Sequence, residues 1–192
     1  MKKTTLITTI IFLFVSASLA GEFSGIGMKL GYNSSTFAGN DIPGKGVSSQ
    51  GGLAIGGFFG YKFNQKFSLQ QEILFTTKGA KINTIGDVYL NNIFMYFEFP
   101  LLAKMTFRPE QMLRPIVFLG PAFGINILAV NDTAVLEDIR AIDFGIVLGA
   151  GIEIWRFVMD VRLYEGLFNF DQSAGDIDLK NRTISIVTGY SF

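Results

Sequence analysis

Glu72 and Glu98 are the residues of this sequence whose type and setting best suit acid–base chemistry. Both stand in stretches where apolar and polar residues alternate, and paired carboxylates are a common arrangement in general acid–base catalysis. The same face carries Lys29, Lys104 and Arg162, so the two carboxylates can instead be held in ion pairs. We favour ion pairs, because unpaired charges in a narrow interior would be costly.

The chain offers little else for catalysis or for metal binding. It contains no His and no Cys, which removes the commonest catalytic base, the Ser–His pair, the thiol nucleophile and the thiolate metal site. Its 16 basic and 16 acidic residues balance, whereas a nucleic-acid-binding surface needs excess positive charge. We therefore expect a protein that is not an enzyme, with no catalytic residues, no cofactor, no metal site and no nucleic-acid partner.

Two weaker motifs have simpler explanations. Gly149 and Gly151 form a G-x-G, but Ile154 stands where a dinucleotide-binding motif needs its third glycine, and no helix pattern follows. Asp171, Asp176 and Asp178 could bind calcium, although their spacing matches no EF-hand. We favour strand packing for the glycines and a solvated loop for the aspartates, and calcium binding stays open.

The N-terminus has the features of a secretory signal peptide. Lys2 and Lys3 precede a short apolar run that ends in small residues up to Ala20. The alternative is an N-terminal anchor helix, but the run is short for a span of about 20 residues. We predict a signal peptide at residues 1–20 and a mature domain at residues 21–192, which has 14 basic and 16 acidic residues and leaves the cytoplasm.

The mature chain alternates between apolar and polar or small residues, which is typical of β-strands. In residues 142–155 the even positions are all apolar, whereas the odd positions carry Asp143, Glu153 and three glycines. Eight such stretches occur: residues 24–33, 52–63, 67–77, 93–107, 115–127, 142–155, 157–166 and 182–192. Long and short connections alternate between them, which predicts an all-β, eight-stranded, antiparallel up-and-down barrel with its short turns at one end.

The distribution of side-chain size indicates which face is outside. A secreted lipocalin-like barrel would turn its apolar face inward around a ligand, whereas a transmembrane barrel turns it toward lipid. The interior of an eight-stranded barrel has room only for side chains, and the polar face here is rich in small residues, so we predict that the bulky apolar face meets lipid. Charged residues avoid that face, and we predict that they form one lumen network: Lys29, Lys62, Glu72, Glu98, Lys104, Asp143, Glu153, Asp160 and Arg162.

Several stretches resemble a known family when they are taken in order along the chain. They are "GIGMKLGYNSSTF", "FSLQQEILFTTKGAK", "YFEFPLLAKMTF", "PIVFLGPAFGI", "IDFGIVLGAGIEI" and the terminal "GYSF". Together they resemble the outer-membrane protein beta-barrel domain family, also called porin-family or PorT-like proteins. The resemblance implies a small barrel in the bacterial outer membrane. It also implies that Tyr190 and Phe192 form a C-terminal signal for the outer-membrane assembly machinery.

For function, we expect a structural and interaction scaffold with a side-chain-filled lumen. Its partners would be outer-membrane lipid, the assembly machinery, and an extracellular or envelope protein bound through the long loops. A narrow porin-like channel for small solutes is the main alternative, and a lipocalin-like carrier or a membrane enzyme is less favoured. The loops carry no motif that names the partner.

Overall fold

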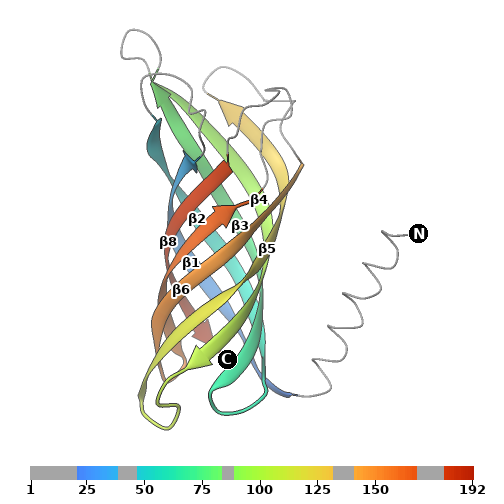
Figure 1. Ribbon diagram of the computed structural model, residues 1–192, viewed down its shortest axis with the longest axis vertical. Coiled ribbons are helices and arrows are strands. Elements are labelled where there is room, and N and C mark those ends of the chain that lie inside the picture. The colour runs from blue at the N-terminus through green and yellow to red at the C-terminus, as the bar shows by residue number, and fades with distance from the viewer. Residues whose placement is uncertain (1–20, 39–46, 84–88, 132–140, 168–179) are drawn as a thin grey trace, which may run out of the picture.

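The protein is a closed antiparallel barrel of eight strands (Figure 1). The computed structural model describes residues 21–38, 47–83, 89–131, 141–167 and 180–192. The strands are β1 (Glu22–Ala38), β2 (Val47–Lys62), β3 (Phe67–Asn83), β4 (Tyr89–Thr106), β5 (Leu113–Asn131), β6 (Ile142–Ile154), β7 (Phe157–Gly166) and β8 (Lys180–Ser191). Each strand pairs with its sequence neighbours, and β8 closes the barrel on β1. The predicted fold class is confirmed, whereas the predicted signal peptide and the three loop aspartates lie outside the described residues.

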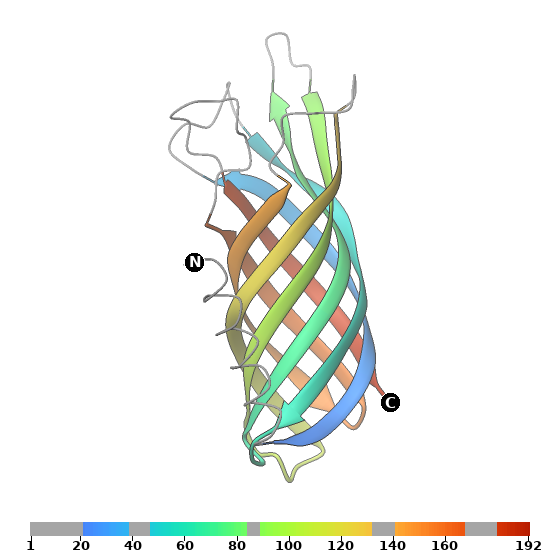
Figure 2. The same cartoon turned by 90° about the vertical axis from the view of Figure 1, so that its right-hand side faces the viewer.

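The two ends of the barrel differ. Residues 63–66, 107–112 and 155–156 make the short turns at one end, where β1 begins and where the C-terminus lies (Figure 1). The strands cross the barrel wall at a marked tilt in both views (Figure 2), as closure of a barrel requires. No helix in the described part of the chain is long and apolar enough to cross a membrane.

The apolar face of the strands points outward. In β6, Leu148 is 55% exposed whereas its neighbour Val147 is 3% exposed, and the same alternation runs through β7 and β8. A continuous exposed surface of Ile, Leu, Met and Phe suits a lipid environment and not water. This orientation confirms the predicted transmembrane barrel and excludes the lipocalin-like carrier, whose apolar face would line the interior.

The interior also holds bulky side chains, which differs from the prediction of a mostly small-residue lumen. Leu102, Ile116, Phe118, Val147 and Tyr164 pack together inside the barrel, with Ala122. Glycines on neighbouring strands make the room: a Cβ atom on Gly149 would collide with the ring of Phe118. Large and small residues therefore alternate across the barrel so that the rings fill space that glycines leave.

Several strands are longer than the sequence pattern predicts. β1 continues to Ala38 and β3 continues to Asn83, although the apolar alternation ends near Asn33 and Thr77. These extensions remain paired in the ladders, β1 with β8 as far as Ala38 and β3 with β4 as far as Asn83, so their stability comes from pairing rather than from lipid contact. The predicted long connections are shortened accordingly, to residues 39–46, 84–88, 132–141 and 167–179.

Gln71 is a polar residue on the outward face of β3, among the apolar side chains of Leu69 and Ile73. The β3–β4 ladder is interrupted opposite Pro100, which has no backbone N–H to donate. The Gln71 side-chain amide donates to the backbone carbonyls of Glu72 (2.9 Å) and Pro100 (3.0 Å). Gln71 therefore satisfies carbonyl groups that the interrupted ladder would leave unpaired in a membrane.

Candidate functional site

Four charged side chains meet in the middle of the barrel, and we call them the central cluster: Lys29, Glu72, Asp160 and Arg162. Lys29 Nζ lies 2.6 Å from Glu72 Oε1 and 3.3 Å from Asp160 Oδ2. Arg162 donates to Glu72 Oε2 at 2.7 Å, and to both oxygens of Asp160 at 2.7 and 2.9 Å. The alternating inward positions of β1, β3 and β7 bring these residues together from distant parts of the sequence.

The central cluster is electrically balanced and closed to solvent. Its two cations face two carboxylates, and the side chains of Glu72 and Asp160 are fully buried. Gln70 adds a further hydrogen bond to Glu72 Oε1 at 2.7 Å. Balance of this kind is needed because an unmatched charge in a low-dielectric interior is strongly destabilising. Glu72 is therefore held by two cations, and its side chain has no exposed surface.

Glu98 belongs to a second group nearer the loop end, which we call the upper cluster: Lys78, Glu98 and Asp143. Lys78 Nζ forms an ion pair with Glu98 and lies 3.2 Å from the ring centroid of Tyr164. Asp143 accepts a hydrogen bond from Asn181 Nδ2 at 3.1 Å. The position of a cation over an aromatic face is favourable when both are removed from water.

The predicted pairing of Glu98 with Lys29, Lys104 or Arg162 is wrong. Its cation is Lys78, which the sequence pattern left out because the apolar alternation of β3 ends at Thr77. Lys78 nevertheless keeps the parity of Glu72 and therefore points into the same lumen. Continuing that parity by one more step would have identified it.

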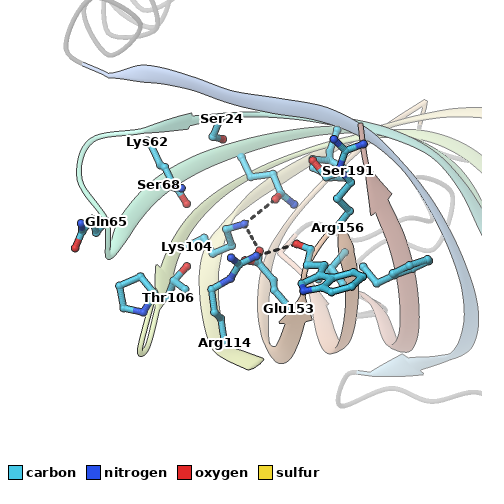
Figure 3. Close-up of a pocket in the computed structure, with 16 residues that line it drawn as sticks. Ser24, Lys62, Gln65, Ser68, Lys104, Thr106, Arg114, Glu153, Arg156 and Ser191 are labelled. Carbon is cyan, nitrogen blue, oxygen red and sulfur yellow. Dashed lines mark hydrogen bonds and ion pairs between the residues drawn. The ribbon is translucent and has the colours of Figure 1, made fainter. Parts of the chain in front are cut away.

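A third group lies at the short-turn end, and we call it the end cluster: Lys104, Arg114 and Glu153. Lys104 Nζ is 2.7 Å from Glu153 Oε1, and Arg114 Nε is 3.5 Å from Glu153 Oε2. Figure 3 shows these three side chains turned toward one another beside a cavity of about 190 Å³. Lys104 also lies 3.4 Å from Gln70 Oε1, so Gln70 connects the end cluster to the central cluster.

The nine predicted lumen residues therefore do not form one network. Lys62 is exposed at the end of β2 and makes no ion pair with a described residue, although it lines the cavity. Lys78 and Arg114 were not predicted; Arg114 precedes the first residue of the apolar pattern in β5. With them, the three clusters contain five cations and five carboxylates. No group of three metal-ligating side chains occurs among the described residues.

Two inward aromatic rings each pack over a glycine and lie beside a buried cation. Phe118, which lies over Gly149, is 5.1 Å from the guanidinium carbon of Arg162. Phe58 lies over Gly27 in the same way and is 5.6 Å from Lys29 Nζ. Because each glycine has no side chain, an aromatic ring can pack against the barrel wall at that position. The face of the ring then lies close enough to a buried cation for a favourable cation–π contact.

The C-terminal residues lie at the short-turn end with other exposed aromatics. Tyr190 packs edge-on against Phe157 and Phe192, with ring centroids 5.1 and 5.5 Å apart. The Phe192 backbone N–H donates to Ile26 O at 2.9 Å, which adds a last hydrogen bond between the C-terminus and β1. Phe192 and Trp155 are 61% and 73% exposed, as expected for aromatics at a membrane interface.

Comparison with known structures finds three proteins of similar chain length. Neisserial surface protein A matches with a TM-score of 0.54 and 13% identity, over 89% of this chain and 99% of that chain. OprG from Pseudomonas aeruginosa matches with a TM-score of 0.49 and 13% identity, over 90% and 98% of the two chains. Ail from Yersinia pestis, in complex with the heparin analogue sucrose octasulfate, has a TM-score of 0.49 and 18% identity over 88% and 99%. At 13% identity, the likeness to Neisserial surface protein A concerns the fold alone.

The sequence itself identifies the family. No curated protein matches the chain, but the profile of the family described as outer membrane protein beta-barrel domain matches residues 17–172. This match covers most of the chain, agrees with the barrel and its apolar exterior, and supports the predicted location in the bacterial outer membrane. The chain belongs to the outer membrane protein beta-barrel domain family.

Proposed function

We propose that this barrel is a structural and interaction scaffold whose lumen does not conduct solutes. The observation that carries the proposal is the central cluster, whose matched charges occupy the middle of the lumen with fully buried carboxylates. Moving a solute past it would require separating ion pairs held at 2.6–2.7 Å in a site without water access. The same pairing supports a role without catalysis, because neither Glu72 nor Glu98 lacks a cation.

Planar-bilayer recording tests the closed lumen. We expect the reconstituted wild-type barrel to show no conductance steps, and a wide porin treated identically provides the positive control. A double variant, Glu72→Ala with Arg162→Ala, removes two of the four cluster side chains and is expected to leak if it folds. Regular steps from the wild type would contradict the scaffold and favour the narrow channel for small solutes.

We propose that the four long connections, at the end opposite the short turns, carry the interaction. In outer-membrane barrels the long loops face the cell exterior and the short turns face the periplasm. Strands β1 and β3 stay paired in their ladders beyond the end of the apolar pattern. The long connections therefore start from hydrogen-bonded strands. The partner would be an extracellular or envelope protein.

Site-specific photo-crosslinking in intact cells tests this role. Crosslinkers at Asn40 and at Ser173, in two long connections, are expected to give discrete adducts with an envelope or extracellular protein. A crosslinker at Glu110, exposed in a short turn, is the matched control. Adducts of equal amount and identity from all three positions would argue against loop-mediated recognition.

The C-terminal residues Tyr190 and Phe192 are the proposed contact with the outer-membrane assembly machinery. Deleting residues 190–192 removes two ladder partners of β1 as well as the aromatics, and is expected to lower the amount of inserted barrel. Phe192→Ala keeps the backbone and removes only an exposed ring, so it isolates recognition from pairing. Phe192→Tyr should restore insertion. Wild-type amounts of heat-modifiable barrel for both the deletion and Phe192→Ala would refute the signal.

A further inference from the structure

The cavity at the short-turn end has an excess of positive charge. Four of its lining residues are cations, Lys62, Lys104, Arg114 and Arg156, and only Glu153 among the lining residues is a carboxylate. Glu153 is already held by Lys104 and Arg114 at 2.7 and 3.5 Å. The lining therefore has more cations than its own carboxylate can balance.

Two of these cations remain free to meet a ligand. Lys62 at the end of β2 and Arg156 in the β6–β7 turn make no ion pair with a described residue, and both are exposed. Glu22 stands opposite Lys62 in the β1–β2 ladder, but the two side chains do not form an ion pair. In Figure 3, Lys62 and Arg156 lie on either side of the Lys104–Glu153 pair.

The cavity wall is also rich in hydrogen-bond donors. Ser24, Ser68, Thr106 and Ser191 line it, and Arg114 Nε, although 3.5 Å from Glu153 Oε2, is buried without a hydrogen bond. Phosphate and carboxylate groups offer several acceptor oxygens and form their strongest hydrogen bonds with cationic donors. The volume of about 190 Å³ leaves room for a group of that size.

We propose that this cavity binds a small oxyanion, a phosphate or carboxylate group, which enters from the periplasmic side. Lys62 and Arg156 would meet the anion at the opening, and Lys104 and Arg114 would meet it deeper in the cavity. The neutral central cluster closes the lumen beyond it, so the ligand binds without passing through. This site is independent of the loops and does not rest on the scaffold role.

The chain contains a built-in reporter for this test. Trp155 is the only tryptophan of the protein and lines the cavity. The folded full-length barrel in uncharged detergent is titrated with inorganic phosphate, pyrophosphate and succinate, with chloride holding the ionic strength constant. We expect a saturable change in Trp155 emission that chloride alone does not produce. If a lipid headgroup phosphate is the natural occupant, the phosphate response persists in detergent and is lost in phospholipid nanodiscs; a soluble anion gives the response in both.

Matched variants assign the response to the cavity. Lys62→Gln and Arg156→Gln, both at exposed positions, are each expected to raise the dissociation constant about fivefold. Lys66→Gln changes an exposed cation in the β2–β3 turn that does not line the cavity and should leave the constant unchanged. Heat-modifiability confirms folding of each variant. The proposal is overturned if none of the three probes gives a saturable response in detergent, or if Lys66→Gln weakens binding as much as Arg156→Gln.

Discussion

The central cluster and the end cluster use the same residue types in the same lumen, yet their charge balance differs. In the central cluster two cations match two carboxylates, and Glu72 and Asp160 have fully buried side chains. In the end cluster Lys104 and Arg114 share one carboxylate, and their side chains are 17% and 28% exposed. Between these two clusters, strict balance accompanies complete burial, and an excess of positive charge accompanies access to water.

The difference has a simple electrostatic cause. An ion that is cut off from water loses its hydration and must recover that energy from partners at short range, whereas water near the opening screens the remaining charge. The central cluster can therefore hold the barrel together but has no capacity for a ligand. The end cluster adds little stability and keeps positive charge that a ligand can use.

The largest effect should come from unbalancing the central cluster. Arg162→Met leaves Glu72 and Asp160 with Lys29 as their only cation, and we expect a loss of about 3–5 kcal/mol in unfolding free energy. Adding Glu72→Gln restores a one-to-one balance, so the double variant should be more stable than the single one. Urea unfolding followed by Trp155 fluorescence measures both, and strictly additive losses would rule out coupling between the two residues.

A cation on the lipid-facing surface would have neither the carboxylate partners of the central cluster nor the water that reaches the end cluster. Leu148→Arg places a cation on the lipid face near the middle of β6, and we expect a loss of about 2–4 kcal/mol. Spin-label accessibility at Leu148 checks the geometry: lipid-soluble oxygen should reach the label and a polar quencher should not. The reverse accessibility would contradict the orientation of the barrel.

A smaller effect is expected at the neighbouring inward position. Gly149→Ala adds a methyl group that would collide with Phe118 and lie 2.8 Å from Val161 O, so we expect a loss of about 1–3 kcal/mol through overpacking. Combining Gly149→Ala with Phe118→Leu should recover part of that loss if the ring is the obstacle. Equal unfolding free energies for the single and combined variants would place the strain in the backbone instead.

The smallest effect should come from the end cluster. Lys104→Met removes one of the two cations of Glu153, but Arg114 and water remain beside that carboxylate, so we expect a loss of at most about 1 kcal/mol. The same urea experiment compares it directly with Arg162→Met. A loss at Lys104 equal to that at Arg162 would show that the two clusters do not differ in the way their burial indicates.

The sequence alone determined the wall of the barrel and its orientation. The parity of residues 142–154 predicts which side chains face lipid, and the exposures of Leu148 and Val147 agree with it. The same alternation, followed in β3 and β7, assigns Glu72, Asp160 and Arg162 to the interior. This works because alternation across a strand is a local property of the backbone, with a period of two residues.

The sequence was less informative at the ends of the strands. Lys78 and Arg114 lie just outside the apolar pattern, because the strands continue by hydrogen bonding where their side chains no longer need to be apolar. The glycine-rich polar face predicts close packing, but it does not show that Phe118 occupies the space beside Gly149. That contact depends on the pairing of β5 with β6.

Only the closed barrel decided which charges meet. Parity sends a side chain inward but does not set its height, which depends on the register of every strand and on the stagger of the closed sheet. The β3–β4 register pairs Glu98 with Leu74, which is two residues from Glu72 and four from Lys78 along β3, yet the cation that Glu98 meets inside the closed barrel is Lys78. The division into a balanced centre and a cationic end follows from those registers, because each inward charge is stabilised by whichever partner closure places at its own level.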